Sequence, residues 1–142
     1  MAHSFNKIWI HAIWATKERI PFISPSIEQK VYHFISTQLR EPGSPVRIIN
    51  GMPDHVHALF LLSPQKSIAE TIKQVKGSSS HFINQSNLTA DKFAGYAAYS
   101  VSESVVERVF QYIRNQKAHH QKKSFSQEHN EFAQLYGLNN RK

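Results

Sequence analysis

The segment His55-Val56-His57-Ala58-Leu59-Phe60-Leu61-Leu62 says most about the fold. Alternate side chains of a strand point to opposite faces, so this segment predicts a strand with His55 and His57 on one face. The opposite face is apolar throughout and belongs in a core; it carries Val56, Ala58, Phe60 and Leu62. The two histidine Cα atoms would lie ~6.5–7 Å apart, a spacing that lets both imidazoles bind one cation.

The segments around this strand predict the order β-α-β-β-α-β-α. Hydrophobic periodicity marks the strands, and Ser/Thr followed three residues later by Glu/Gln marks the helix starts. We expect a first strand at 7–14, followed by a helix that Ser26 and Gln29 open and Pro42-Gly43-Ser44-Pro45 stops, and then strands at 46–50 and 55–62. Next come a helix opened by Ser67 and Glu70 and a strand at 93–100. Ser104 and Glu107 open a helix that runs to about Gln121, and a short helix from about Gln127 to Tyr136, ended by Gly137, follows it.

The first six elements form the ferredoxin-like arrangement, an α+β fold whose antiparallel sheet carries two helices on one face. The buried stripes of these helices are expected to contain Ile27, Val31, Phe34, Ile35 and Leu39 in the first, and Ile68, Ile72, Val75 and Phe82 in the second. Without an internal repeat or linker, residues 1–142 are expected to form one domain. The additional C-terminal helix must pack against another part of the protein.

The composition favours a polyanionic partner. Seventeen Lys and Arg against ten Asp and Glu give a formal net charge of +7, which attracts nucleic acid in a salt-dependent way. Cysteine is absent, which excludes disulfides and thiolate metal sites. The apolar run 58–62 is far shorter than the ~20 residues that span a bilayer. We therefore expect a cytoplasmic protein with no membrane association.

The two strand histidines have two interpretations. They can bind a divalent metal, with Asp54 either orienting an imidazole or serving as a further ligand. They can also be half-exposed surface residues, because nine histidines in the chain make one His-x-His pair weak support on its own. The pair His119-His120 differs, since adjacent helical residues point in different directions. We expect that pair to be a polar surface feature or a phosphate contact.

The last long helix places Tyr112 and Gln116 one turn apart on the same surface. A tyrosine at the edge of an apolar stripe is commonly a core residue. Alternatively it is a nucleophile: a phenol with a pKa of ~10 needs a nearby cation to attack phosphorus. A metal between His55, His57 and Gln116 would supply this help, and such a mixed N/O site suits Mg²⁺ or Mn²⁺, although imidazole also binds Zn²⁺. Candidate phosphate contacts are Arg108, Arg114 and Lys117 beside the tyrosine, and Lys73 and Lys76 on the preceding helix.

These motifs together resemble the single-tyrosine HUH transposases of insertion sequences, to which the REP-associated tyrosine transposases are related. The likeness extends from the first strand to His120. It is carried by Gly51-Met52-Pro53-Asp54-His55-Val56-His57, by Gly95-Tyr96-Ala97-Ala98-Tyr99-Ser100-Val101-Ser102 and by Tyr112-Ile113-Arg114-Asn115-Gln116. One departure is Asp91-Lys92-Phe93-Ala94, where family members often carry a tryptophan, which puts a substrate or packing contact in doubt.

The resemblance implies a bacterial or archaeal homodimer that binds hairpin ends of a mobile element. It implies that Tyr112 attacks single-stranded DNA to give a 5′-phosphotyrosine and a free 3′-hydroxyl, with His55, His57 and Gln116 as metal ligands. The tyrosine helix can serve its own subunit or the partner. The residues alone leave two other functions open: a non-enzymatic single-stranded nucleic-acid-binding module, and a metal-dependent hydrolase in which Tyr112 is structural.

Overall fold

A computed structural model of the chain describes residues 6–87, 93–119 and 127. Its four strands form an antiparallel sheet in the order β2-β3-β1-β4. The predicted strands are confirmed, with ends displaced by up to two residues. The strands are β1 (Trp9–Thr16), β2 (Val46–Met52), β3 (His55–Leu61) and β4 (Phe93–Val101); the helices are α1 (Glu28–Arg40), α2 (Ile68–Asn87), α3 (Val106–Arg114) and α4 (Gln116–His119), with 3-10 turns η1 (Lys17–Arg19) and η2 (Glu103–Val105).

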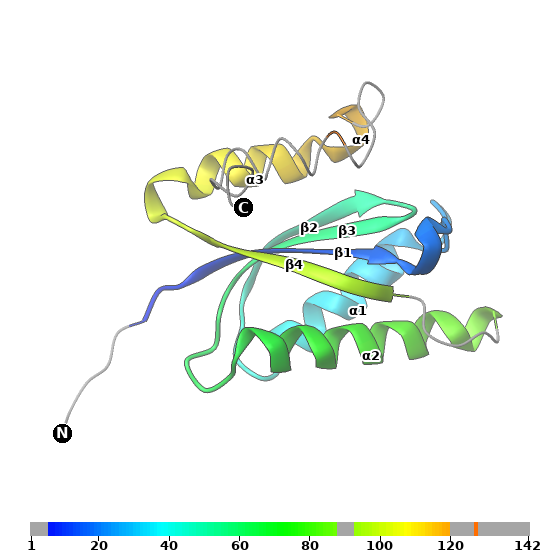
Figure 1. Ribbon diagram of the computed structural model, residues 1–142, viewed down its shortest axis with the longest axis horizontal. Coiled ribbons are helices and arrows are strands. Elements are labelled where there is room, and N and C mark those ends of the chain that lie inside the picture. Colours follow the sequence, from blue (N-terminus) through cyan, green and yellow to red (C-terminus); the bar gives the residue numbers. More distant parts are fainter. Residues whose placement is uncertain (1–5, 88–92, 120–126, 128–142) are drawn as a thin grey trace, which may run out of the picture.

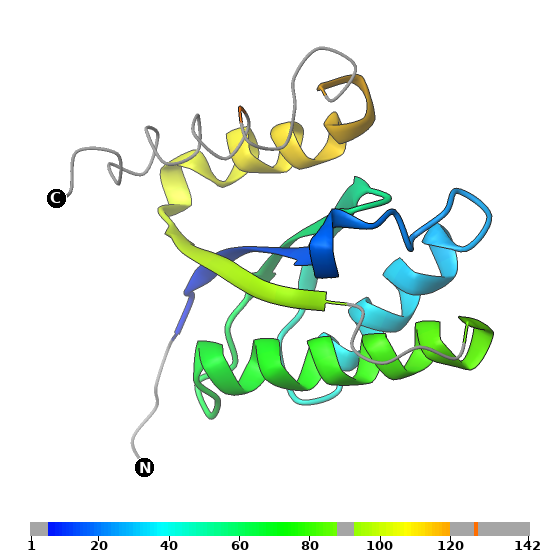
Figure 2. The same ribbon diagram turned by 45° about the vertical axis from the view of Figure 1, so that its right-hand side comes forward.

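The sheet is covered on both faces (Figures 1 and 2). Helices α1 and α2 lie on one face, as the ferredoxin-like prediction requires, and α3 crosses the other. The α1–α2 side holds the larger core, which includes Ile10, Ala12, Trp14, Val56, Ala58, Phe60, Val31, Ile35, Leu39, Ile72 and Val75. The α3 side holds a smaller core of Leu59, Val101, Val106, Val109 and Ile113. Alternate residues of β3 therefore pack into two different cores.

The predicted capping box of α2 is confirmed. The Glu70 backbone N–H donates to Ser67 Oγ at 3.0 Å, and the Ser67 backbone N–H donates to Glu70 Oε1 at 3.1 Å. The hydrogen bond that the Glu70 carboxylate accepts from the Ser67 backbone, together with the nearby Ser67 hydroxyl, lowers the pKa of that carboxyl. The start of α2 could therefore be predicted from four residues of sequence.

The other two predicted capping boxes are wrong. At α1 the N-cap residue is Ile27, and Ser26 Oγ bonds Ser24 Oγ instead, at 2.9 Å. At α3 the turn η2 precedes the helix, which begins at Val106. Glu107 does not cap the helix; its carboxylate accepts a hydrogen bond from Arg47 of β2 at 3.1 Å. A tertiary contact has replaced the local one.

The last long helix is also shorter than predicted. Helix α3 ends at Arg114, Asn115 leaves helical geometry with φ −94° and ψ 18°, and α4 follows. Tyr112 and Gln116 consequently stand on opposite sides of a helix break. Apart from Gln127 itself, the predicted helix from about Gln127 to Tyr136 lies outside the described residues, as do its terminal Gly137, residue His120 and the side chains of Phe82 and His119.

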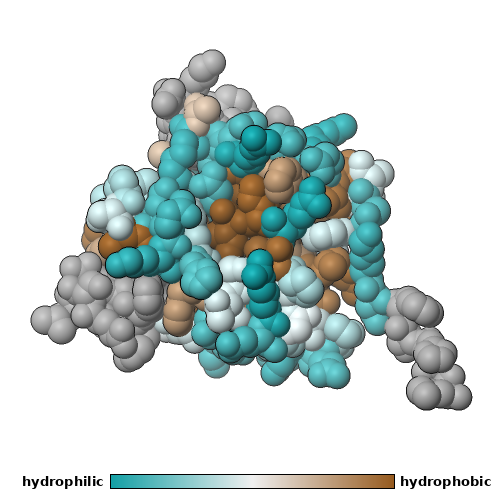
Figure 3. Space-filling view, turned by 180° about the vertical axis from the view of Figure 1, so that it is seen from behind, coloured by the Kyte–Doolittle hydropathy of each residue, from teal (hydrophilic) through white to brown (hydrophobic). Residues whose placement is uncertain are grey.

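The surface opposite the viewpoint of Figure 1 gathers apolar residues at its centre, with hydrophilic side chains around them (Figure 3). Folded proteins expose much apolar area, so this patch alone assigns no partner. Across the described ranges, no helix combines the length and apolar character required to cross a bilayer.

Two glycines offer a matched test of the β2–β3 hairpin. A Cβ on Gly51 would lie 2.2 Å from the His55 carbonyl oxygen and 3.0 Å from Val56 Cα, whereas a Cβ on Gly77 of α2 meets nothing within 4 Å. Gly51→Ala should therefore lower the free energy of unfolding by about 2 kcal/mol or more, because backbone must move. Gly77→Ala should raise it by about 0.5–1 kcal/mol. Urea unfolding measures both, and a Gly51→Ala protein as stable as the parent would contradict the hairpin geometry.

Candidate active site

Strand β3 directs His55 and His57 toward α3. Both side chains are fully buried, and their ring centroids lie 5.2 Å apart with the ring planes at 74°. Buried imidazoles need hydrogen-bond partners, because leaving their nitrogens without one is costly away from water. The hydrogen-bond partners come from three places in the chain, namely the turn before β3, strand β1 and helix α4, and with them the histidines form the candidate site.

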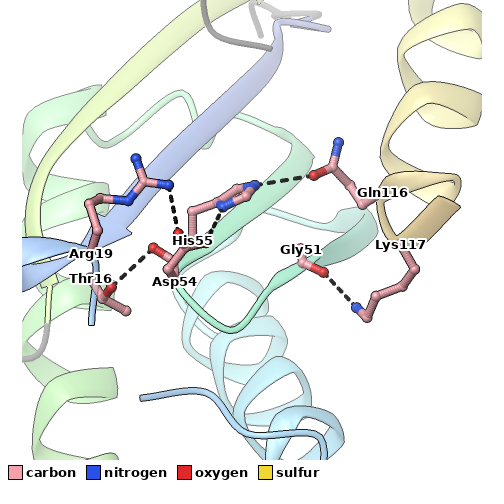
Figure 4. A network of polar contacts seen from close by, with 7 residues as sticks. All are labelled: Thr16, Arg19, Gly51, Asp54, His55, Gln116 and Lys117. Carbon is pink, nitrogen blue, oxygen red and sulfur yellow. Dashed lines mark hydrogen bonds and ion pairs between the residues drawn. The ribbon is translucent and has the colours of Figure 1, made fainter. Parts of the chain in front are cut away.

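His55 is held at both ring nitrogens (Figure 4). Its Nδ1 lies 2.8 Å from Asp54 Oδ1, and its Nε2 lies 3.2 Å from the Oε1 of Gln116, which is also fully buried. A carboxylate only accepts, so the hydrogen on Nδ1 donates to Asp54. In neutral His55, Nε2 then carries a lone pair that faces the amide oxygen. Two acceptors that converge in this way suit a cation, or a proton on Nε2.

Asp54 connects His55 to a charged support. Its Oδ2 accepts a hydrogen bond from Arg19 at 2.8 Å. Burial by itself would raise the pKa of this carboxyl, but the hydrogen bonds from His55 and Arg19 outweigh burial and lower the pKa to about 2. Asp54 is therefore ionised at neutral pH. Arg19 reaches it from η1, where Glu18 and Arg19 adopt left-handed φ values of 56° and 60°, uncommon for residues with a Cβ.

His57 has a different support. Its Nδ1 lies 2.9 Å from Nε2 of His11 on β1, and the two rings stack with centroids 5.1 Å apart. His11 is fully buried, and sequence reasoning missed it. The available signal was a histidine in the middle of the otherwise apolar run 8–14 of the first predicted strand, a position that polar residues rarely occupy without a partner.

Tyr112 of α3 lies beside the histidines of its own chain. Its ring centroid is 5.9 Å from that of His57, in an edge-to-face arrangement at 67°. The residue is half-buried and its hydroxyl is shielded from solvent. The predicted tyrosine, the two predicted histidines and Gln116 are thus brought together within one protomer.

The end of α3 is fixed by β2. The Asn50 side-chain amide donates to the carbonyl oxygens of Ile113 at 3.0 Å and Arg114 at 3.2 Å. These are carbonyls of the last helical turn, which need partners from outside the helix. Asn50 also pairs across the sheet with His57, so one residue links the helix break to the histidine strand. Asn50 was not predicted.

The predicted phosphate contacts are scattered. Arg108 and Arg114 are exposed on α3, near Tyr112. The Lys117 ammonium lies within the protein's own network, with Gly51 O at 2.5 Å, Asn50 Oδ1 at 3.0 Å and Glu28 Oε2 at 3.2 Å. Lys73 and Lys76 are on α2, across the sheet from α3 (Figure 2). Of these five predicted contacts, the three on α3 and α4 lie on the sheet face that carries the histidines, and a DNA contact by any of the five stays a prediction.

Comparison with known proteins gives a consistent picture. The family model of IS200-like transposases matches residues 4–116, which include His11, His55, His57, Tyr112 and Gln116. The transposase TnpA of ISDra2 from Deinococcus radiodurans is 27% identical over 114 residues, covering 75% of this chain and 81% of the relative.

Two solved structures resemble the fold. The crystal structure of a candidate transposase from Deinococcus radiodurans R1 has a TM-score of 0.64 at 25% identity and covers 82% of this chain and 95% of that one. A REP-associated tyrosine transposase bound to a REP hairpin has a TM-score of 0.61 at 12% identity, and the match covers 84% of this chain and 74% of that one. At this identity the match shows a shared fold. Because the family match spans most of the chain, this protein belongs to the IS200-like transposase family.

Proposed function

We propose that this transposase cleaves and rejoins single-stranded DNA at the ends of an insertion sequence through a 5′-phosphotyrosine on Tyr112. The observation that carries the proposal is the position of the Tyr112 ring against His57, in the same chain and beside the His55–Gln116 contact. A tyrosine that served only the α3 core would not need buried imidazoles beside it.

The residues present fit a divalent cation. The donor set is Nε2 of His55, Nε2 of His57 and Oε1 of Gln116, a mixed N/O set that suits Mg²⁺ or Mn²⁺. Among the described residues no three His, Cys, Asp or Glu side chains converge on one point, so the amide oxygen of Gln116 is needed to complete the set. When bound, the metal would polarise the scissile phosphate and stabilise charge on its oxygens.

The chain's own residues perform the remaining tasks. Tyr112 supplies the attacking oxygen, which bonds to phosphorus as the bond to the 3′ oxygen breaks. The phenol loses a proton and the departing 3′ oxygen gains one, so the step is balanced without a redox partner or ATP. Attack by a 3′-hydroxyl reverses these events at a new junction. Asp54 and Arg19 keep the His55 ring oriented throughout.

The proposed partner is single-stranded DNA, probed best as a hairpin. Support comes from the net charge of +7 and from the fold shared with a REP-associated transposase that was solved with its hairpin. Arg108 and Arg114, exposed on the same helix as Tyr112, are the cations best placed to meet phosphates. The family resemblance further supports a homodimer.

Tyr112→Phe should abolish the covalent adduct, because the attacking oxygen is removed while the ring that packs on His57 stays. Incubation with labelled hairpin DNA and Mn²⁺, followed by denaturing electrophoresis, measures the adduct, and a gel-shift assay should show DNA binding retained. Tyr96→Phe is the matched control, since Tyr96 is an exposed tyrosine of β4. An undiminished adduct in Tyr112→Phe would contradict the assignment and would point to another nucleophile. Absence of any adduct in the parent protein would instead favour a nucleic-acid-binding module.

Gln116→Leu should weaken Mn²⁺ binding at least about tenfold, because it removes one of three proposed ligands from a buried position. Gln111→Leu, an exposed change on α3, should leave binding unchanged. Isothermal titration calorimetry measures the affinity. Chelation with EDTA should stop adduct formation by the parent protein without preventing hairpin binding, and cleavage that proceeds in EDTA would refute metal dependence.

A further inference from the structure

We propose that His11 is a positioning residue that selects the ring tautomer of His57. This inference rests on the proposed function, since it concerns the readiness of His57 to bind a metal. His11 lies on β1 next to β3, directly opposite Leu59 on one side and Tyr99 of β4 on the other. These pairings place it on the sheet face that α3 covers, and its side chain is fully buried.

The short contact between the two rings requires a single hydrogen between them. His11 Nε2 and His57 Nδ1 are 2.9 Å apart, so one nitrogen donates and the other accepts. Two arrangements satisfy the bond. Either His57 carries its hydrogen on Nδ1 and His11 accepts, or His11 donates and the hydrogen of His57 moves to Nε2.

Only the first arrangement leaves Nε2 of His57 able to bind a metal. A neutral imidazole binds a metal through the nitrogen that carries no hydrogen, and the hydrogen bond made by the other nitrogen sets which one that is. When His11 Nε2 accepts, His57 Nε2 keeps its lone pair. The same contact prevents His11 Nε2 from being a ligand, because it faces the Nδ1 side of His57.

The two histidines of β3 are therefore supported in chemically different ways. His55 donates to Asp54, a carboxylate that only accepts and therefore fixes the tautomer by itself. His57 meets an imidazole, which can donate or accept. The tautomer of His57 is therefore set by that of a second buried ring, which makes His11 a determinant of the site although it does not contact the proposed metal.

Ring tautomers can be measured directly in metal-free protein. Long-range proton–nitrogen correlation spectra of ¹⁵N-histidine-labelled protein, under mildly basic conditions, distinguish a ring with hydrogen on Nδ1 from one with hydrogen on Nε2. We expect His57 of the parent protein to carry its hydrogen on Nδ1. This readout requires neither a variant nor catalysis, and a His57 ring with its hydrogen on Nε2 would overturn the proposal.

Variants test the consequence for the metal. His11→Met puts an apolar side chain of similar length in place of the imidazole and so removes the acceptor; it should lower the Mn²⁺ affinity in calorimetry by about 10–100-fold. His11→Gln can place an amide oxygen where the His11 Nε2 was and should restore the affinity to within about threefold of the parent. Ile13→Met is the packing control: Ile13 pairs with His57 on the same sheet face, and its change should leave affinity within about threefold.

The outcomes separate this inference from the proposed function. An affinity in His11→Met within threefold of the parent, together with loss of binding in His57→Ala, would overturn the role of His11 and leave the metal site standing. Unchanged Mn²⁺ affinity in His57→Ala would overturn the ligand assignment and, with it, the positioning role of His11. Equal losses in His11→Met and Ile13→Met would reduce His11 to a packing residue.

Discussion

Burial of β3 on both faces is the constraint on which the rest of the structure depends. Residues 55 to 60 are fully buried, so the strand cannot present its histidines to water. Away from water every imidazole nitrogen needs a partner. This requirement accounts for the ionised Asp54 held by Arg19, for the buried His11 and for the buried amide of Gln116. The smaller core on the α3 side can pack against β3 because this polar network gives the histidine nitrogens their partners.

A second consequence concerns the helix that carries Tyr112. Packing of α3 on the sheet buries Val109 and Ile113 and leaves the carbonyls of its last turn near β2. Asn50 satisfies those carbonyls and Lys117 bonds the adjacent hairpin backbone. The break at Asn115 is thereby fixed relative to β3. Tyr112 before the break and Gln116 after it can both face the histidines, although they belong to two helices.

Much of this arrangement could be predicted because it is local. Alternation along β3 places His55 and His57 on one face, and the reciprocal bonds of Ser67 and Glu70 start α2. The same local rule failed at Ser26 and Ser104. There, neighbouring serines and the distant Arg47 bond the groups that would have capped the helices. A local signal is reliable only where no tertiary partner competes for the same atoms.

By itself the sequence determined the order of elements, the ferredoxin-like sheet and the shared face of the two strand histidines, since each follows from the period of side chains along one segment. Tertiary structure decided the rest. The pairing of β1 with β3 brings His11 to His57 across 46 positions of chain, and β2 meets the end of α3 across 63. Such contacts depend on strand register and helix docking, which are set by packing among distant segments, and no spacing within one segment encodes them.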